Sequence, residues 1–428
     1  MPWIHEEGPL SHSRIRELTE HVALEARARL CTTPRRVLLL PPDCTRAHSG
    51  AGWITNALYH HFAPSAQVHL IPTLGQHVPH TPEQNRWMFG DIPPERIHVH
   101  DWRSGVVTIG EVPASFVETV SGGKAGGPIP VSVNRMLVEE QWDLIINIGH
   151  VVPHEVLGFA NHNKNYFIGL GGKDMICASH MMAARCGIEQ NLGRLITPLR
   201  ACYNKAQEDY LSHLPDLFVQ VVMAYNDAGE LHHCGFFAGD DLATYMAAAR
   251  ASQRHNITIT RPLHKVVAVM QGDEFHSTWV ANKAVYRTRM ALADGGELLI
   301  IAPGLKRFGE QPEVDALIRK YGYRGTRQIM DAYRVEPDLQ DLTHGTAHLL
   351  HGSTEGRFTI TYAPGHLSQK EIRGVGYGYL DIGAALKQYD LSSMRTGFTS
   401  MPNGEEVYFI STPSAGLWST RERMCLPA

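Results

Sequence analysis

Three short apolar runs in the first half of the chain each lead directly into a loop that carries histidine. The runs and the loops that follow them are 37–40 with 41–48, 68–71 with 72–77, and 144–148 with 149–154. Such runs are typical of buried strands. In an open parallel sheet, the loops that leave the carboxyl ends of neighbouring strands meet at one crevice, where ligands bind. We therefore predict that the three loops build one active site and that the chain is an enzyme.

The length and the charge of the chain exclude several classes of protein. A chain of 428 residues favours two domains, since single cores stop growing at about 250–300 residues. The net charge of -4 gives no electrostatic basis for binding nucleic acid or an anionic membrane. No apolar stretch approaches the ~20 residues that span a bilayer, and the N-terminus lacks the apolar core of a signal peptide. Seven cysteines without a C-x-x-C pair fit a reducing cytoplasm, where we expect the protein.

The order of the predicted elements indicates an α/β fold with two domains. Short apolar strands alternate with longer helical stretches up to about residue 250, which is the pattern of a parallel sheet with crossover helices. A polar, proline-marked segment at 256–262 then precedes a new strand. We predict a Rossmann-like catalytic and cofactor-binding domain over 1–258 and a smaller α/β domain over 259–428. Analogy, rather than the pattern itself, suggests that about the last 20 residues return to the N-terminal domain. Within the second domain we expect a helix over 279–293.

Asp43 and Arg46 follow the first apolar run. A guanidinium is a planar fork that binds a carboxylate through two parallel hydrogen bonds. Arg46 is therefore a candidate for binding a substrate carboxylate, with Asp43 orienting a neighbouring side chain. The alternative is an ordinary turn with a local ion pair.

His77 and His154 are candidates for the general acid and the general base. Imidazole titrates near neutral pH, so one ring can begin neutral while the other begins protonated. A pair that can exchange these roles suits a reaction that runs in both stereochemical directions. A single loop histidine is more often structural, but two at neighbouring strand ends favour catalysis.

Lys164 and the glycines that follow it suggest a site for a phosphate or a covalently bound group. A lysine behind an active-site loop can bind phosphate, form a Schiff base or carry a covalent attachment, and it can equally be a solvated loop lysine. Gly171 and Gly172 would let a phosphate approach closely, although the run matches neither nucleotide-binding fingerprint. His180, on or near a predicted helix, is a candidate metal ligand.

Together these residues resemble the nickel-pincer-nucleotide lactate racemase family, most strongly from about residue 35 to 185. The similarity lies in the spacing as well as the type of the following segments: Asp43-x-Thr45-Arg46, Gly75-x-His77, Pro153-His154, Lys164, His180 and Lys283. The resemblance implies a nickel ion held by a pyridinium mononucleotide that is covalently attached at Lys164. It also implies that His180 binds the nickel and that Asn163, Gly171 and Gly172 contact the cofactor.

The reaction that the resemblance implies is racemisation or epimerisation of a 2-hydroxy acid. Either His77 or His154 removes the hydroxyl proton while the Cα hydrogen leaves as a hydride to the cofactor and returns to either face. A positioned base contributes about 3–5 kcal/mol, which is little compared with removing a proton beside a carboxylate anion, and hydride transfer avoids that carbanion. The implied partners are the enzymes that synthesise the cofactor and a small 2-hydroxy acid substrate. We expect the substrate-binding residues to be Arg46, Lys283, Asp43 and Trp279.

Two segments differ from the pattern of the family. Ala160-Asn161-His162-Asn163 replaces a Ser-Gly-Gly-rich run before the lysine, which predicts altered contacts to the cofactor phosphate or a rearranged loop. Trp279-Val280-Ala281-Asn282-Lys283 replaces Tyr-Gln-x-x-Lys. We therefore expect a substrate other than lactate, such as a larger 2-hydroxy acid of the sugar-acid type.

Two other functions remain open from the residues alone. His150, His154, His180 and Asp43 could bind zinc in a hydrolase or a lyase, because imidazole and carboxylate are zinc ligands. Glycine and proline within 149–153 nevertheless favour a loop rather than a helix there. The second alternative is a non-catalytic homologue that binds the cofactor without turnover.

Overall fold

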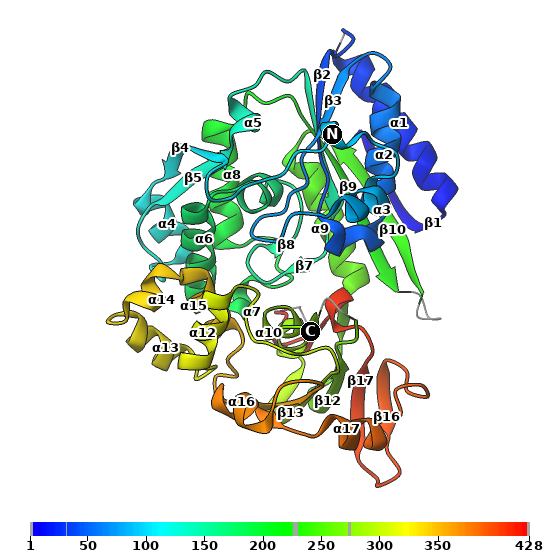
Figure 1. The fold of residues 1–428 in the computed structure, drawn as a ribbon. Helices are drawn as coiled ribbons and strands as arrows, with labels where there is room; N and C mark the ends of the chain where they lie inside the picture. The colour runs from blue at the N-terminus through cyan, green and yellow to red at the C-terminus, as the bar shows by residue number, and fades with distance from the viewer. Residues whose placement is uncertain (1–2, 31, 226–229, 273–274, 426–428) are drawn as a thin grey trace. The chain divides into compact units, whose positions relative to one another are not determined.

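The three apolar runs form adjacent parallel strands in the computed structural model, which describes residues 3–30, 32–225, 230–272 and 275–425 (Figure 1). Their sheet has the order β1-β10-β9-β6-β2-β3. The strands are β1 (Ile4–Leu10), β2 (Arg36–Leu40), β3 (Gln67–Leu70), β6 (Leu144–His150), β9 (Asp216–Tyr225) and β10 (Leu231–Gly239). Strands β9, β6, β2 and β3 are parallel, whereas β10 and β1 continue the sheet as antiparallel strands. The predicted α/β fold is confirmed, and its sheet is mixed at one edge.

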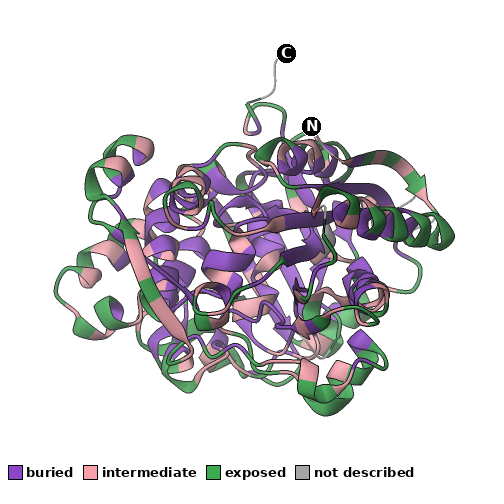
Figure 2. Ribbon diagram, turned by 90° about the horizontal axis from the view of Figure 1, so that it is seen from above, coloured by how far each residue is buried: buried purple, intermediate pink, exposed green. Residues whose placement is uncertain are grey.

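Alternation along β2 explains why helices cover both faces of this sheet. Val37 and Leu39 pack in the core that includes α1 and α2, whereas Leu38 and Leu40 pack in the core that includes α6 and α8, because successive strand side chains point to opposite faces. Buried residues accordingly concentrate in the strands, and exposed residues lie on the outer surfaces of helices (Figure 2). The remaining elements of this unit are α1 (His12–Leu30), α2 (Ala51–Phe62), α3 (Pro82–Phe89), β4 (Val106–Val112), α4 (Ala114–Ser121), β5 (Ile129–Asn134), α5 (Arg135–Val138), β7 (Pro153–His154), β8 (Gly158–Phe159), α6 (Lys173–Cys186), α8 (Pro198–Tyr210) and α9 (Leu242–Asn256).

The second unit is built on its own sheet, in the order β15-β14-β13-β12-β17-β16. All neighbours in it are parallel except β16 and β17. Its elements are β11 (Ile257–Ile259), β12 (Leu263–Val269), α10 (Thr278–Ala281), α11 (Lys283–Thr288), β13 (Leu292–Ala302), α12 (Pro312–Tyr321), α13 (Thr326–Tyr333), α14 (Pro337–Asp341), α15 (Thr343–His351), β14 (Phe358–Pro364), α16 (Gln369–Gly374), β15 (Gly378–Tyr379), α17 (Ile382–Gln388), β16 (Gly397–Ser400), β17 (Glu406–Ile410) and β18 (Leu417–Ser419). No helix in the described parts of either unit is long and apolar enough to cross a membrane.

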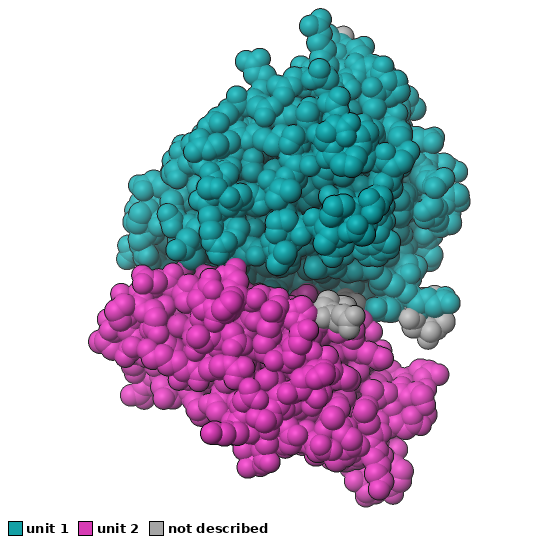
Figure 3. Space-filling model, in the orientation of Figure 1, with its two compact units in different colours: residues 1–186, 190–256 teal, residues 187–189, 257–428 magenta. Residues whose placement is uncertain are grey.

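The chain divides into one unit of residues 1–186 and 190–256 and another of residues 187–189 and 257–428 (Figure 3). The predicted boundary after residue 258 falls close to this division. The C-terminal segment, for which we expected a return to the first domain, is grouped with the second unit. There β18 pairs in parallel with β11, at the start of that unit.

The helix expected over 279–293 is wrong in its length. Two short helices, α10 and α11, occupy its first part, and β13 already begins at Leu292. The side chain of Asn282, between the two helices, accepts a hydrogen bond from the Tyr362 hydroxyl (2.8 Å) and donates one to Tyr377. Leu292 pairs with Leu263 of β12. Long-range partners therefore override a local helical pattern.

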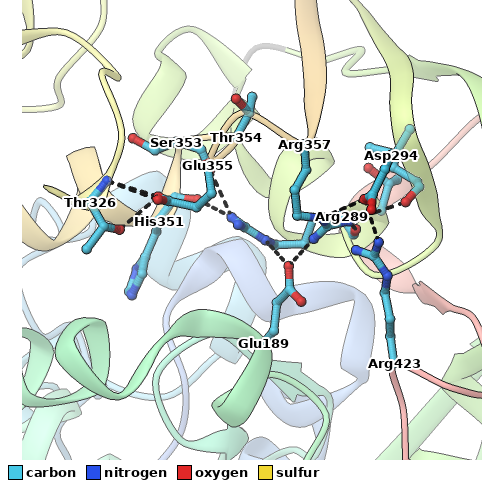
Figure 4. A network of polar contacts seen from close by, with 12 residues as sticks. Glu189, Arg289, Asp294, Thr326, His351, Ser353, Thr354, Glu355, Arg357 and Arg423 are labelled. Carbon is cyan, nitrogen blue, oxygen red and sulfur yellow. Dashed lines mark hydrogen bonds and ion pairs between the residues drawn. The ribbon is translucent and has the colours of Figure 1, made fainter. Parts of the chain in front are cut away.

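Glu189 is held in the second unit by a network of ion pairs (Figure 4). Its Oε1 accepts from Arg289 Nε (3.1 Å) and from Arg357 Nη1 (2.6 Å). Arg357 also pairs with Asp294, which in turn accepts from Arg423. The side chain of Arg289 is only 4% exposed, so its charge depends on the carboxylate of Glu189 for compensation.

We expect Glu189→Ala to lower the free energy of unfolding by about 2 kcal/mol, because it leaves the buried Arg289 cation without this carboxylate. Denaturant unfolding would measure the loss, and hydrogen exchange would place it in the second unit. Asp331→Ala is the control, since its pair with Arg334 is exposed and is worth less than about 1 kcal/mol. Equal losses in the two variants would contradict the prediction.

Candidate active site

The loops that leave β2 and β3 run side by side. The Thr73 amide donates to the Pro41 carbonyl over 2.8 Å, just beyond the ends of the two strands. Asp43 then caps the short 3₁₀-helix η1 (Cys44–Ser49), where its Oδ1 accepts from the Thr45 amide (3.1 Å). The backbone thus fixes one carboxylate oxygen of Asp43 and leaves the other for the neighbouring loop.

The second oxygen of Asp43 forms a short hydrogen bond and ion pair with Nδ1 of His77. Asp43 is 5% exposed, whereas the side chain of His77 is 55% exposed. Burial alone would raise the pKa of Asp43, but the positive charge of His77 and the hydrogen bonds from His77 and Thr45 hold it well below its ordinary value. A carboxylate at Nδ1 orients the ring and leaves Nε2 of His77 as the atom that can take up or release a proton.

His80 forms a second contact between the same two loops. Its Nε2 accepts from the Cys44 amide (2.9 Å), and its Nδ1 lies 3.0 Å from Oδ1 of Asn85 in α3. Because an amide N–H can only donate, the hydrogen of a neutral His80 ring is on Nδ1 and points to Asn85. We did not single out His80 from the sequence, where its only signal is its place between His77 and the start of a helix.

Arg46 lies in η1 and is half-buried. Among the described residues, its guanidinium makes no hydrogen bond or ion pair. Its positive charge nevertheless contributes to lowering the pKa values of Asp43, His154 and Lys164. Arg46 is therefore close to all three, with a guanidinium available for a carboxylate.

His154 lies in β7 and is buried. Its Nδ1 accepts from the Val156 amide (3.2 Å), so a neutral ring carries its hydrogen on Nε2. Burial lowers the pKa of His154 well below its ordinary value, and the positive charges of Lys164 and Arg46 lower it further. The ring is thus neutral near pH 7 and presents an N–H donor.

Lys164 directly precedes a single π-helical turn at Asn165–Gly169. Burial lowers the pKa of Lys164 to about 8, and the charges of Arg46 and Arg200 act in the same direction against nearby carboxylates. In the described part of the chain the amine makes no hydrogen bond. A lysine with this pKa has an appreciable neutral, nucleophilic fraction near neutral pH.

His180 lies on α6 and donates from Nδ1 to the Ile176 carbonyl over 2.8 Å. This bond fixes the tautomer and leaves the Nε2 lone pair available. Burial lowers the pKa of His180, and the charge of Lys164 contributes to the same shift. A neutral imidazole with a fixed second nitrogen is the usual form of a histidine metal ligand.

Six of the residues predicted from the sequence therefore interact in one region of the first unit. They are Asp43, Arg46, His77, His154, Lys164 and His180. The region combines an oriented histidine, a neutral histidine, an amine with a lowered pKa, a guanidinium and an available imidazole nitrogen. Such a set can bind a carboxylate and move a proton at a bound hydroxyl group.

Comparison with known proteins connects this region to a family. Residues 11–191, which carry all six residues, match the model of the lactate racemase N-terminal domain. This segment is a lactate racemase N-terminal domain. None of the curated proteins matches the chain significantly.

Two solved structures share the fold of nearly the whole chain. One is the crystal structure of a protein from Thermotoga maritima, with 24% identity, a TM-score of 0.79, and coverage of 97% of this chain and 99% of that chain. The other is the lactate racemase apoprotein from Thermoanaerobacterium thermosaccharolyticum, with 16% identity, a TM-score of 0.71, and coverage of 97% and 94%. At these identities the likeness shows the fold.

Two of the predicted cofactor-binding residues of the lactate racemase N-terminal domain, Gly171 and Gly172, are packed against the chain itself. A Cβ at Gly171 would lie 2.0 Å from the Phe167 carbonyl oxygen, and one at Gly172 would lie 2.4 Å from Oγ of Ser132. Close packing therefore suffices to require glycine at both positions. Their contact with a cofactor stays a prediction.

A backbone hydrogen bond joins the His77 loop to the segment that follows Lys164. The Gly75 amide donates to the Gly169 carbonyl over 2.8 Å. A Cβ at Gly169 would lie 2.5 Å from Cβ of Thr73, so this close approach requires glycine.

The segment Ala160–Asn163, which differs from the family pattern, has a backbone that favours glycine at two positions. Asn161 and His162 have φ angles of 68° and 58°. Asn163, predicted to bind the cofactor, is buried and accepts a short hydrogen bond from Arg200. We did not identify Arg200 from the sequence, although an arginine on the buried side of α8 was the available signal.

The two predicted substrate-binding residues of the second unit are both half-buried. Lys283 is the first residue of α11. The Trp279 ring, in α10, stacks on His348 with 4.5 Å between ring centroids. Their role in binding substrate stays a prediction.

The alternative zinc site is not formed. In the described ranges, no three His, Cys, Asp or Glu side chains are arranged to hold a metal ion. Asp43 is engaged by His77, and Nδ1 of His154 accepts from the Val156 amide, so the neutral ring of His154 carries a hydrogen rather than a lone pair on Nε2. A hydrolase or lyase site with His150, His154, His180 and Asp43 as zinc ligands is therefore not supported.

We expect Asp43→Asn to lower the free energy of unfolding by about 1–3 kcal/mol at pH 6, because Asp43 accepts charge-assisted hydrogen bonds. The pKa of Asp43 is lower in the folded protein than in the unfolded chain, so this stabilisation is complete above the unfolded pKa of about 4 and is lost as the pH falls towards the folded pKa. Urea unfolding at pH 6 and pH 3 should show the difference between wild type and variant shrinking. A difference in the free energy of unfolding that stays constant between pH 6 and pH 3 would refute the lowered pKa of Asp43. The control is Asp209→Asn, which removes a carboxylate from a surface ion pair with Lys205.

Proposed function

We propose that this protein is a racemase or epimerase of a 2-hydroxy acid that uses a nickel-pincer nucleotide. The observation that carries this proposal is the grouping of Lys164, His180, His154 and Arg46 beside the Asp43–His77 pair, within a lactate racemase N-terminal domain. Family membership supports the coarser statement, an isomerase of this general type. The substrate and the mechanism are our proposal.

The residues of the site fit such a cofactor. Covalent attachment needs an amine that is nucleophilic near neutral pH, and burial gives Lys164 a pKa of about 8. Nickel binding needs an imidazole nitrogen with a free lone pair, and the bond from Nδ1 of His180 to Ile176 leaves Nε2 in that state. The cofactor, when bound, would accept the Cα hydrogen of the substrate as a hydride and return it.

The protein itself would hold the substrate and move the hydroxyl proton. Arg46 would bind the carboxylate through its planar fork. His77, with Asp43 on Nδ1, can take up a proton at Nε2, while the neutral His154 offers Nε2–H to the substrate oxygen. Exchange of these two roles would serve the two stereochemical directions.

The substrate that we propose is a 2-hydroxy acid larger than lactate, such as a sugar acid. The segment Trp279–Lys283 has valine where the family has glutamine, which removes an amide from the set of polar groups that would contact substrate. Specific hydrogen-bonding groups strongly determine which hydroxyl-bearing substrates are accepted. Lys283 and Trp279 remain the proposed substrate-binding residues of the second unit. Enzymes that synthesise the cofactor in the cytoplasm are the proposed partners.

The decisive experiment is intact-protein mass spectrometry on the full chain, produced together with cofactor-synthesis enzymes. We expect a covalent adduct that is absent from Lys164→Ala. Lys173→Ala, a substitution at the start of α6, is the matched control and should keep the adduct. A protein that stays unmodified under these conditions would exclude the proposed attachment. An adduct without turnover of any 2-hydroxy acid would instead indicate a cofactor-binding homologue.

We expect His77→Ala and His154→Ala to reduce racemisation of the accepted substrate by about 10²–10⁴-fold, which is the contribution of a positioned acid or base. Both variants should keep the adduct, because neither ring attaches the cofactor. Chiral chromatography of the product would measure the rates. His80→Gln, which removes a histidine from the same loop while retaining hydrogen-bonding groups, is the comparison. Full activity in either alanine variant would remove that histidine from the mechanism.

A further inference from the structure

The segment before Lys164 has a backbone that favours glycine but side chains that are not glycine. Asn161 and His162 are in the left-handed region, and both are at most 3% exposed. This conformation costs an ordinary residue about 1–2 kcal/mol. It persists only where the surrounding structure determines it.

The side chains of Asn161 and His162 both have specific contacts. Oδ1 of Asn161 accepts from Nδ2 of Asn165 over 2.8 Å. The ring of His162 stacks on Phe218 with 4.2 Å between centroids and lies 5.0 Å from the ring of Tyr245. Side-chain contacts therefore hold a backbone that glycine would adopt without them.

Arg200, on α8, connects both ends of the segment. Its Nη2 donates to the Phe159 carbonyl (2.7 Å) and to the Tyr245 hydroxyl (2.8 Å). Its Nη1 donates to Oδ1 of Asn163 in a short hydrogen bond. Because Asn163 precedes Lys164, a single guanidinium restrains the backbone from Phe159 to the lysine.

Burying an arginine on a helix face carries a large desolvation cost. Arg200 is 3% exposed, and no carboxylate in the described ranges forms an ion pair with it. Removing a cation from water costs several kcal/mol unless partners compensate. The neighbouring buried residues of α8, Leu199, Cys202 and Tyr203, show that an apolar side chain suits this face. The forked donor set of Arg200 is therefore best explained by the three groups that it joins.

We propose that Arg200 is a positioning residue for Lys164, which it holds at one half-buried position by joining Phe159, Asn163 and Tyr245. Only the identity of the group that would be attached to Lys164 rests on the proposed function. The position of the amine is a property of the cofactor-free chain and can be measured there.

The reactivity of Lys164 towards a small reagent reports this position. The charged and titratable groups that act on the amine, or on which it acts, are Asp43, Arg46, His154, Glu155, His180 and Arg200. Burial is the largest cause of the lowered pKa of about 8. If the segment moves and the amine becomes more exposed to water, the pKa of Lys164 returns towards its ordinary value of 10.5.

The experiment is competitive acetylation of the cofactor-free full chain with acetic anhydride at pH 6–11, followed by peptide mass spectrometry. In wild type we expect the reaction of Lys164 to be half-maximal near pH 8. In Arg200→Gln and Arg200→Lys we expect this midpoint to rise by at least about one pH unit. The lysine variant keeps a charge but carries all its donors on one nitrogen, so it cannot span the acceptors that the two terminal nitrogens of Arg200 reach. A role of the fork therefore predicts a shift in both variants.

Lys205, on the same helix α8 and paired with Asp209, is the internal control and should keep its midpoint. A wild-type midpoint in Arg200→Lys, or in both variants, would overturn the proposal. If the Arg200 variants do not fold, Asn163→Ala removes one acceptor only and should raise the midpoint in the same direction. An unchanged midpoint in that variant would also overturn it. Failure of the adduct experiment would refute the attachment at Lys164 without affecting these midpoints.

Discussion

The hydrogen bond between Asp43 and His77 depends on the parallel order of β2 and β3. Only because both strands end at the same edge of the sheet can a carboxylate capping one loop reach an imidazole on the next. β6 lies on the other side of β2 and sends its own loop, with His154, to the same edge. The chemistry proposed for the site thus follows from three neighbouring strands whose apolar residues require burial on both faces.

Much of this arrangement could be predicted from local patterns. Apolar runs followed by Asp43, His77 and His154 are sufficient to place these residues at strand ends, because continuous apolar runs indicate buried strands and the residues follow them in the chain. The antiparallel edge formed by β10 and β1 could not be read in the same way. Strand orientation at an edge depends on which segments pair, and a single strand carries no mark of its partner's direction.

His80 and Arg200 show why parts of the site were missed. Each acts through partners that are distant in sequence: His80 accepts from Cys44, and Arg200 donates to Phe159 and Tyr245. Nothing in their immediate neighbours indicates these contacts. The departure at 160–163 was visible in the sequence, but its meaning was not. The structure has a left-handed backbone at Asn161 and His162 and supports it with side chains, which only the folded contacts reveal.

The hydrogen bond from the Gly75 amide to the Gly169 carbonyl couples the position of the His77 loop to that of the segment after Lys164. Gly75 lies two residues before the ring oriented by Asp43, and Gly169 ends the π-helical turn that begins after Lys164. Neither loop can relax independently without stretching this bond. A change in the length of either loop would therefore also displace the other, whereas a change of side chain need not.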